Sequence, residues 1–148
     1  MKYFSTRNKN LNFSFKDVFL RGLAPDGGLF IPQKLKIYNS SELKELSNLK
    51  YTDLATEIIS NFCGSDIEKS KLKALIEKAY KSFDSEDVVT IKKIGNLNLL
   101  ELYHGPTLAF KDIAMQVKFS FIFSFVKSLI LSVNVQRLSD GDNTFVFH

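Results

Sequence analysis

The first half of the chain repeats hydrophobic residues at the three- and four-residue spacing of amphipathic helices. The first such stretch follows Ser14, a typical N-cap residue, and Asp17 completes an acidic variant of the capping box. Gly22 is expected to end that helix. The most regular stretch lies at 66–83, where lysines cover the polar side. Its apolar face consists of Ile67, Leu72, Leu75, Ile76 and Ala79.

Two shorter helices are expected between these stretches, at residues 40–49 and 52–62. Ser40 or Ser41 would cap the first and Thr52 the second, because hydroxyl side chains accept hydrogen bonds from the free N–H groups of a first turn. Together, these helices predict a small, mostly helical N-terminal domain.

Two short strand segments flank the first helix. Residues 2–6 are predicted to form an opening strand. In the stretch 24–32, APDGGLFIP, the Pro-Asp-Gly-Gly sequence predicts a turn that reverses the chain. The residues expected to pack after this turn are Leu29, Phe30 and Ile31.

A second pair of strands is predicted within residues 88–103, around a turn at Gly95 and Asn96. This hairpin would carry the chain from the helical unit, residues 1–85, into a second segment, residues 86–148. Three features of the second segment bear on function: a strongly apolar window, a lone lysine after a turn, and a glycine-poor end.

Composition and charge narrow the function classes. Hydrophobic residues make up 45% and charged residues 24%, so a packed core is expected. The net charge of +4 comes from lysines scattered among acids, without a basic stripe, so no nucleic-acid partner is expected. Cys63, the single cysteine, rules out an internal disulfide and is interpreted as a small buried residue. We expect no metal site, and the N-terminus lacks a signal-peptide pattern, so a cytoplasmic location is expected.

Residues 117–135 form the most apolar window of the chain. Lys118 and Lys127 interrupt it, and a charge near the middle of a membrane span costs roughly 3 kcal/mol. A membrane-spanning helix is therefore disfavoured, and peripheral attachment through this window is the weaker alternative.

The stretch 104–112, HGPTLAFKD, places one lysine after a Gly-Pro turn. An unperturbed lysine has a pKa of about 10.4 and is protonated at neutral pH. A desolvated pocket lowers such a pKa and frees an amine that can attack an aldehyde. The turn would fix the direction of Lys111. Local chemistry alone favours the alternative, a surface lysine in the first turn of a helix.

Two separated motifs favour the reactive interpretation of Lys111 over that of a surface lysine. SFKDVFLRGLAPDGGLFIP at 14–32 is followed about seventy residues later by LELYHGPTLAFKD at 100–112. In this order and at this separation, the motifs resemble those of the threonine synthases, pyridoxal-phosphate enzymes of fold type II. The resemblance covers roughly residues 1–116. It implies an α+β or α/β architecture, with a small helical domain at 1–85 and the start of a fold type II catalytic domain at 86–148.

The resemblance also implies a chemistry. The cofactor would be pyridoxal 5'-phosphate, and Lys111, its Schiff-base partner, would be both the cofactor-binding and the catalytic residue. The implied carbon–oxygen lyase reaction converts O-phospho-L-homoserine to L-threonine and phosphate. Phe110 and Leu108 are expected to form a dry wall beside the amine. Asp112 would orient Lys111 or serve as an exposed partner at the helix start. His104 is expected to be a strand-end residue satisfied by backbone groups, without a catalytic role.

After Gln116 the chain departs from the family pattern. The end of the chain, LSDGDNTFVFH at 138–148, has one glycine between two acids where the family carries a glycine-rich phosphate loop. Within 118–131, four phenylalanines alternate with the period of a strand, where the family continues a helix. The chain is therefore predicted to be a truncated or frame-disrupted threonine synthase with little or no turnover by itself.

Two alternatives remain. The first is a non-catalytic interaction module that self-associates or pairs with a complementary fragment through an exposed apolar patch at 117–133. The second is a fragment of a related pyridoxal-phosphate-dependent phospho-lyase.

Overall fold

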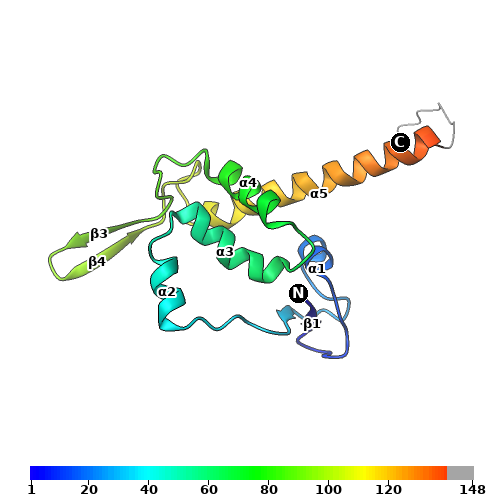
Figure 1. The fold of residues 1–148 in the computed structure, drawn as a ribbon, viewed down its shortest axis with the longest axis horizontal. Helices are drawn as coiled ribbons and strands as arrows, with labels where there is room; N and C mark the ends of the chain where they lie inside the picture. The colour runs from blue at the N-terminus through cyan, green and yellow to red at the C-terminus, as the bar shows by residue number, and fades with distance from the viewer. Residues whose placement is uncertain (140–148) are drawn as a thin grey trace.

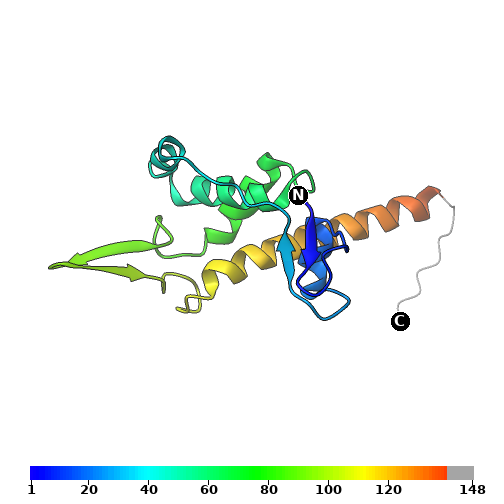
Figure 2. The ribbon, with the colours of Figure 1, turned by 90° about the horizontal axis from the view of Figure 1, so that it is seen from below.

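The computed structural model describes residues 1–139, which form five helices and two small antiparallel sheets. In chain order the elements are β1 (Tyr3–Ser5), α1 (Phe15–Arg21), β2 (Phe30–Pro32), α2 (Ser40–Leu46), α3 (Tyr51–Cys63), α4 (Lys69–Tyr80), β3 (Thr90–Ile94), β4 (Leu97–Glu101) and α5 (Asp112–Ser139). Helix α4 packs against both α3 and α5. The β3–β4 hairpin and the far end of α5 extend on opposite sides of this helical centre (Figure 1 and Figure 2). The mixture of helices and small sheets agrees with the α+β prediction.

The predicted turn leads the chain back to the N-terminal strand. Strand β2 pairs antiparallel with β1, with Ser5 opposite Phe30. Gly28 lies against this pair, and a Cβ at that position would overlap the Ser5 hydroxyl, so the turn requires glycine. Leu29 and Ile31, which were expected to pack, are exposed because a two-stranded sheet leaves one side of its strands uncovered.

Side-chain caps begin α1 and α2, and one of the predicted caps is correct. The Ser14 hydroxyl accepts a hydrogen bond from the Asp17 N–H, and the Asp17 carboxylate accepts one from the Ser14 N–H, which confirms the capping box. The predictions of Ser40 or Ser41 for α2 and Thr52 for α3 are wrong. The cap of α2 is Asn39, which forms its own capping box one residue earlier. Helix α3 begins after Lys50, without a side-chain cap.

The core lies between α3, α4 and α5, and it includes most of the apolar face predicted for α4. Cys63, Leu72 and Ile76 are fully buried, in agreement with the sequence interpretation. From α5, Val117 and Phe121 join the same core cluster. The lysine-bearing segment is thus packed directly against the N-terminal helices.

The four alternating phenylalanines of the apolar window lie on a helix. Phe121 and Phe125 are four residues apart, so they share one face of α5 and pack toward α1 through Phe19. Phe119 and Phe123 are also four residues apart and lie on another face, which is exposed. The alternation therefore reflects two pairs of aromatic residues on different faces, and the strand-like period was misleading.

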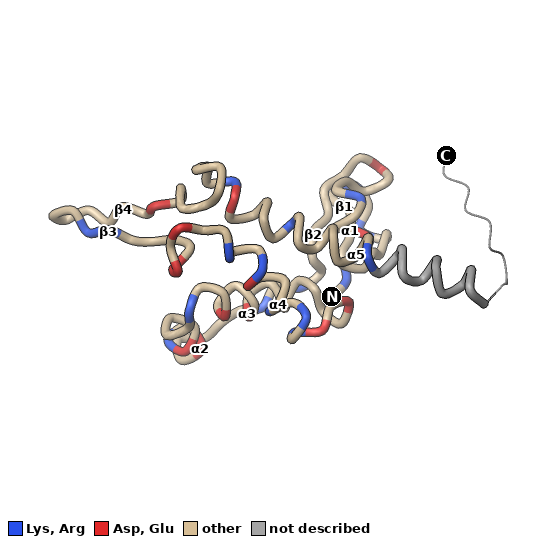
Figure 3. Tube along the Cα trace, turned by 90° about the horizontal axis from the view of Figure 1, so that it is seen from above, with Lys and Arg blue, Asp and Glu red and all other residues tan. Residues whose placement is uncertain are grey.

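The distribution of charge and the character of the helices both bear on possible partners. Lysine and arginine residues are interspersed with acidic residues along the trace (Figure 3). Within residues 1–139, none of the helices combines the length and the apolar character that crossing a membrane requires.

The packing of α5 predicts a contrast between two phenylalanines of the same helix. Phe121→Ala is expected to lower the free energy of unfolding by about 3–5 kcal/mol, because it removes a buried ring that contacts Phe15 and Phe19. The matched control, Phe123→Ala, is expected to change it by no more than about 0.5 kcal/mol, because that ring is 71% exposed. Urea unfolding followed by circular dichroism measures both. Equal losses would contradict the assignment of the buried face.

Candidate functional site

The motif HGPTLAFKD forms the loop between β4 and α5. Lys111 is the last residue of this loop, directly before Asp112 begins the helix, and its side chain is exposed. None of the ion pairs found within residues 1–139 involves Lys111. The residue predicted to be catalytic is therefore accessible, on a short connection between two regular elements.

The helix end of the loop is fixed by a buried carboxylate. Asp112 is 4% exposed, and its Oδ2 accepts hydrogen bonds from the Thr107 N–H at 2.7 Å and the Thr107 hydroxyl at 2.8 Å. Gly105 lies against the same carboxylate, and a Cβ there would overlap it. Burial by itself raises the pKa of Asp112, but the hydrogen bonds to its carboxylate, of which those from Thr107 contribute most, together hold that pKa below its usual value.

This arrangement differs from both roles expected of Asp112. Its carboxylate is neither exposed nor directed to Lys111, because the two donors of Thr107 engage it inside the loop. The result is a small ring of interactions that closes residues 105–112 on themselves.

The dry wall expected from Leu108 and Phe110 is absent among the described residues. The two side chains are 70% and 63% exposed. The Leu108 N–H donates to the Gly105 carbonyl, and Leu108 itself has a φ of 59°, in the left-handed region that non-glycine residues rarely adopt. Within residues 1–139 no element covers this side of the loop, so the prediction of a water-excluding wall is wrong for this part of the chain.

The strand end of the loop is fixed by His104. Its Nδ1 lies 2.7 Å from Asp84 Oδ1, and its Nε2 lies 3.1 Å from Glu101 Oε2. The Asp84 N–H also donates to the His104 carbonyl. The expectation that backbone groups satisfy the His104 side chain is wrong, because the ring nitrogens contact two carboxylates from different elements. Asp84 holds the pKa of His104 above its ordinary value of 6.5, against the opposing effect of burial.

Glu101 is the buried centre of this cluster. It is 4% exposed, and it accepts hydrogen bonds from Lys92 at 2.7 Å, Thr90 at 2.7 Å and Tyr103 at 2.8 Å, besides its contact with His104. These donors, of which Lys92 has the largest effect, lower the pKa of Glu101 to about 2.

Some contacts of this cluster could have been predicted from the sequence. Once the Gly95 turn is fixed, the hairpin register places Thr90 opposite Glu101, with Lys92 diagonal to it on the same side. Asp84 lies in the connection between α4 and β3, and His104 lies twenty positions later, in the connection between β4 and α5. No local sequence pattern predicts that these two side chains meet.

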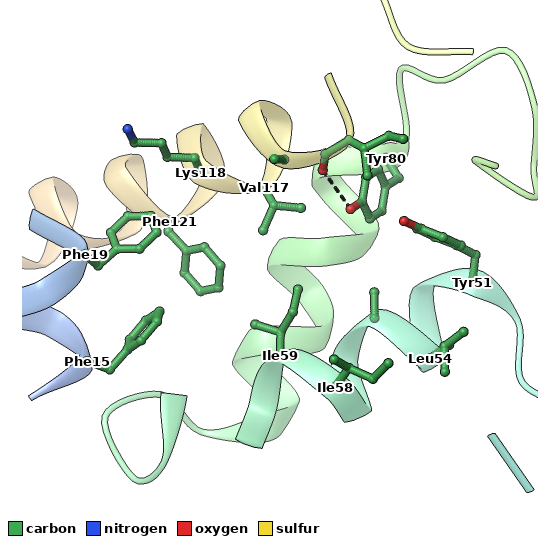
Figure 4. A pocket seen from close by; sticks show the side chains of 13 residues that line it. Phe15, Phe19, Tyr51, Leu54, Ile58, Ile59, Tyr80, Val117, Lys118 and Phe121 are labelled. Atoms are coloured by element: carbon green, nitrogen blue, oxygen red, sulfur yellow. Dashed lines mark hydrogen bonds between the residues drawn. The ribbon is translucent and has the colours of Figure 1, made fainter. Parts of the chain in front are cut away.

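The described residues also form an open apolar cavity of about 560 Å³ between α1, α3 and α5 (Figure 4). It is lined mainly by aromatic and aliphatic side chains, with Lys118 of α5 also at its wall and Tyr80 at one end, where the Tyr80 hydroxyl donates to the Ile113 carbonyl at 2.9 Å. Lys111 does not line this cavity. The cavity and the candidate catalytic lysine are therefore separate features.

Glu101 generates a prediction on stability. Because its folded pKa, about 2, lies below the ordinary 4.5, the ionised cluster stabilises the fold fully above pH 4.5, and this contribution is lost as the pH falls toward 2. Glu101→Gln is expected to flatten this part of the unfolding profile. The exposed carboxylate Glu45 offers the control Glu45→Gln, which should leave the profile unchanged. Urea unfolding at a series of pH values measures both, and parallel profiles for wild type and Glu101→Gln would contradict the assignment.

Comparison with known proteins extends these observations. A family model described as "Threonine synthase N terminus" matches residues 2–80. Threonine synthase of Schizosaccharomyces pombe is 40% identical over 118 residues, which cover 78% of this chain and 23% of that protein. Threonine synthase-like 2 of Homo sapiens is 36% identical over 144 residues, which cover 96% of this chain and 30% of that protein.

A solved structure agrees in fold. The crystal structure of threonine synthase with bound pyridoxal phosphate from Brucella melitensis matches with a TM-score of 0.77 and 36% identity, over 82% of this chain and 26% of that one. The chain thus spans about a quarter of the length of the relatives it matches. Since the family model covers more than half of the chain and the fold agrees, the resemblance of the two motifs is confirmed, and the chain belongs to the threonine synthase family.

Proposed function

We propose that this chain forms the N-terminal part of a pyridoxal-phosphate-dependent threonine synthase of the cytoplasm and that Lys111 holds the cofactor. The proposed reaction converts O-phospho-L-homoserine to L-threonine and phosphate. Residues 1–85 would form the N-terminal domain, and residues 86–148 would contribute to the cofactor-binding domain. The observation that carries the proposal is the exposed Lys111 on the HGPTLAFKD loop, which lies in the part of the chain that aligns with threonine synthase-like 2 of Homo sapiens. The pyridoxal phosphate bound to the Brucella melitensis relative supports the choice of cofactor.

The Lys111 side chain fits one requirement of this cofactor, since a primary amine is the group that bonds an aldehyde. The neighbouring carboxylate, Asp112, is engaged by Thr107 and does not occupy the amine. When bound, pyridoxal phosphate supplies an electron sink for negative charge at the substrate α-carbon. Residues 140–148, which contain most of the predicted LSDGDNTFVFH loop, lie outside the described residues.

Each part of the loop has a role in this proposal. Asp112, Thr107 and Gly105 hold the backbone on either side of Lys111. Lys111 is the group that would remove the proton from the substrate α-carbon and return one later in the reaction.

The surroundings of Lys111 support the further proposal that the chain has little or no turnover by itself. Leu108 and Phe110 are exposed, so the described residues do not exclude water from the amine. Catalysis of this kind depends on a closed site with fixed dipoles, in which charge is stabilised without rearrangement of solvent. The rest of such a site would come from protein beyond the quarter of the family's length that this chain spans.

Cofactor labelling tests the role of Lys111. When the chain is mixed with pyridoxal phosphate and reduced with borohydride, we expect partial labelling, concentrated on Lys111, because the contacts of Asp112 and Thr107 hold the backbone beside it and leave its side chain exposed. Lys118, an exposed lysine on α5, serves as the reference site in peptide mass spectrometry. Lys111→Arg is expected to abolish the preferred label, and Lys118→Arg to leave it intact. Labelling spread evenly over the lysines would sink the proposal.

Phosphate release tests the absence of turnover. With pyridoxal phosphate and O-phospho-L-homoserine, the wild-type chain is expected to release phosphate no faster than Lys111→Ala. Sustained release well above that variant would overturn the claim of inactivity, while supporting the assignment of Lys111.

A second candidate function is a non-catalytic interaction module. The observation in its favour is the exposed apolar stripe on α5, which consists of Met115, Phe119, Phe123 and Val126. If this stripe pairs with a second copy of the chain, light scattering after size-exclusion chromatography should show a concentration-dependent dimer that Phe119→Ser with Phe123→Ser abolishes. A monomer at all concentrations would count against this candidate.

A further inference from the structure

We infer that His104 is the positioning residue of the lysine loop: by bridging Asp84 and Glu101, it fixes the segment 105–111 to the rest of the protein and so sets the direction of Lys111. The role of this direction in cofactor binding rests on the proposed function. The ordering of the loop by His104 does not.

The geometry makes His104 the junction of three parts of the chain. Asp84 belongs to the connection between α4 and β3, and it is joined to His104 twice, through its N–H to the His104 carbonyl at 3.0 Å and through its carboxylate to Nδ1 at 2.7 Å. On the other side of the ring, Nε2 contacts Glu101, the last residue of β4, at 3.1 Å. The hairpin, the end of the helical unit and the loop therefore meet at one imidazole.

The protonation state of the imidazole decides whether both bridges exist. A neutral ring has a single N–H, so it donates to Asp84 or to Glu101, whereas the protonated ring donates to both. With Nδ1–H directed to Asp84, a neutral ring would turn the Nε2 lone pair toward the Glu101 carboxylate. The other groups that face the ring are the Thr90 hydroxyl, 3.1 Å from Nε2, and the Tyr103 ring, 4.8 Å away between centroids. Lys92 is paired with Glu101 on its other oxygen.

The sign of the pH effect follows from these contacts. Because Asp84 raises the pKa of His104 above 6.5, the double bridge is complete below that pH and is lost as the pH rises through the folded pKa. Glu101 stays ionised throughout this range, since its pKa is about 2.

A short path leads from His104 to the lysine. Gly105 follows His104 directly, and its carbonyl accepts the Leu108 N–H at 3.0 Å. The same glycine lies against Asp112, whose carboxylate holds Thr107. A displacement of His104 therefore disturbs the ring of contacts that ends beside Lys111.

Backbone strain on both sides of the junction is consistent with this role. Val88, which is 2% exposed in the connection after Asp84, has a φ of 59°, as does Leu108 in the loop. A β-branched residue holds such a conformation only where its surroundings over-determine it. The bridge from Asp84 to His104 ties together the two connections that contain these strained residues.

Amide hydrogen exchange by NMR tests the inference without the cofactor. The protection of the Thr107 and Leu108 amides is measured over a pH series that begins near 6 and extends upward through the His104 titration, relative to the Ile76 amide of α4, which reports the integrity of the core. In wild type, loop protection is expected to fall about tenfold across the His104 titration, as for the loss of one hydrogen bond to a charged group. His104→Ala should lack loop protection at every pH. His104→Asn, which keeps one donor for Asp84, should retain part of it without a pH step.

If His104 had only a structural role, its substitution would lower the protection of the loop amides, but wild type would show no pH step in that protection. Unchanged loop protection in His104→Ala, or a step that persists in that variant, would overturn the inference. Should His104→Ala lose protection at Ile76 as well, His104→Asn decides: a pH step that persists there overturns the inference, and its absence supports it.

Pyridoxal phosphate labelling separates this inference from the proposed function. If His104 positions the loop for the cofactor, His104→Ala lowers the ratio of label at Lys111 to label at Lys118 about tenfold, in step with loop protection. Preferred labelling of Lys111 that does not change in His104→Ala would overturn the positioning role. A pH-dependent loop without preferred labelling in wild type would support the ordering of the loop by His104 and contradict the proposed cofactor role of Lys111.

Discussion

At the start of α5, the carboxylate of Asp112 lies buried with the two donors of Thr107 on one of its oxygens. A buried carboxylate without partners is strongly unfavourable, so the loop that supplies these donors and the helix that supplies the carboxylate stabilise each other. Gly105 is required for this approach because a side chain there would occupy the place of the carboxylate. This packing holds the backbone beside Lys111, which lies one residue before Asp112.

Helix α5 connects the Asp112–Thr107 contacts to the rest of the protein. Its first turn receives the Tyr80 hydroxyl at the Ile113 carbonyl, which joins it to the end of α4. Two turns further on, the Phe121 ring packs against Phe15 and Phe19 of α1. The segment that carries the candidate catalytic lysine therefore shares a core with the N-terminal helices. The opposite face of α5 leaves apolar side chains exposed, which is the basis of the interaction-module alternative.

The sequence predicted what local chemistry determines. Ser14 caps α1 and Gly95 turns the hairpin as expected, because each acts on groups within a few residues. Asn39 was missed as the cap of α2, since two serines beside it satisfy the same rule. Leu108 was expected in a dry wall, but its exposure depends on which elements cover the loop, and spacing carries no information on that. The role of His104 depends on a partner in another connection, so only the folded chain shows it.

A closed ring of contacts between Asp112 and Thr107 presents Lys111. A double-mutant cycle tests it most directly, with the ratio of pyridoxal phosphate label at Lys111 to label at Lys118 as the measured quantity. Thr107→Val and Asp112→Ala are each expected to lower this ratio, and the double variant to lower it no further than Asp112→Ala alone. Effects that multiply independently, or a ratio that neither variant changes, would contradict the account.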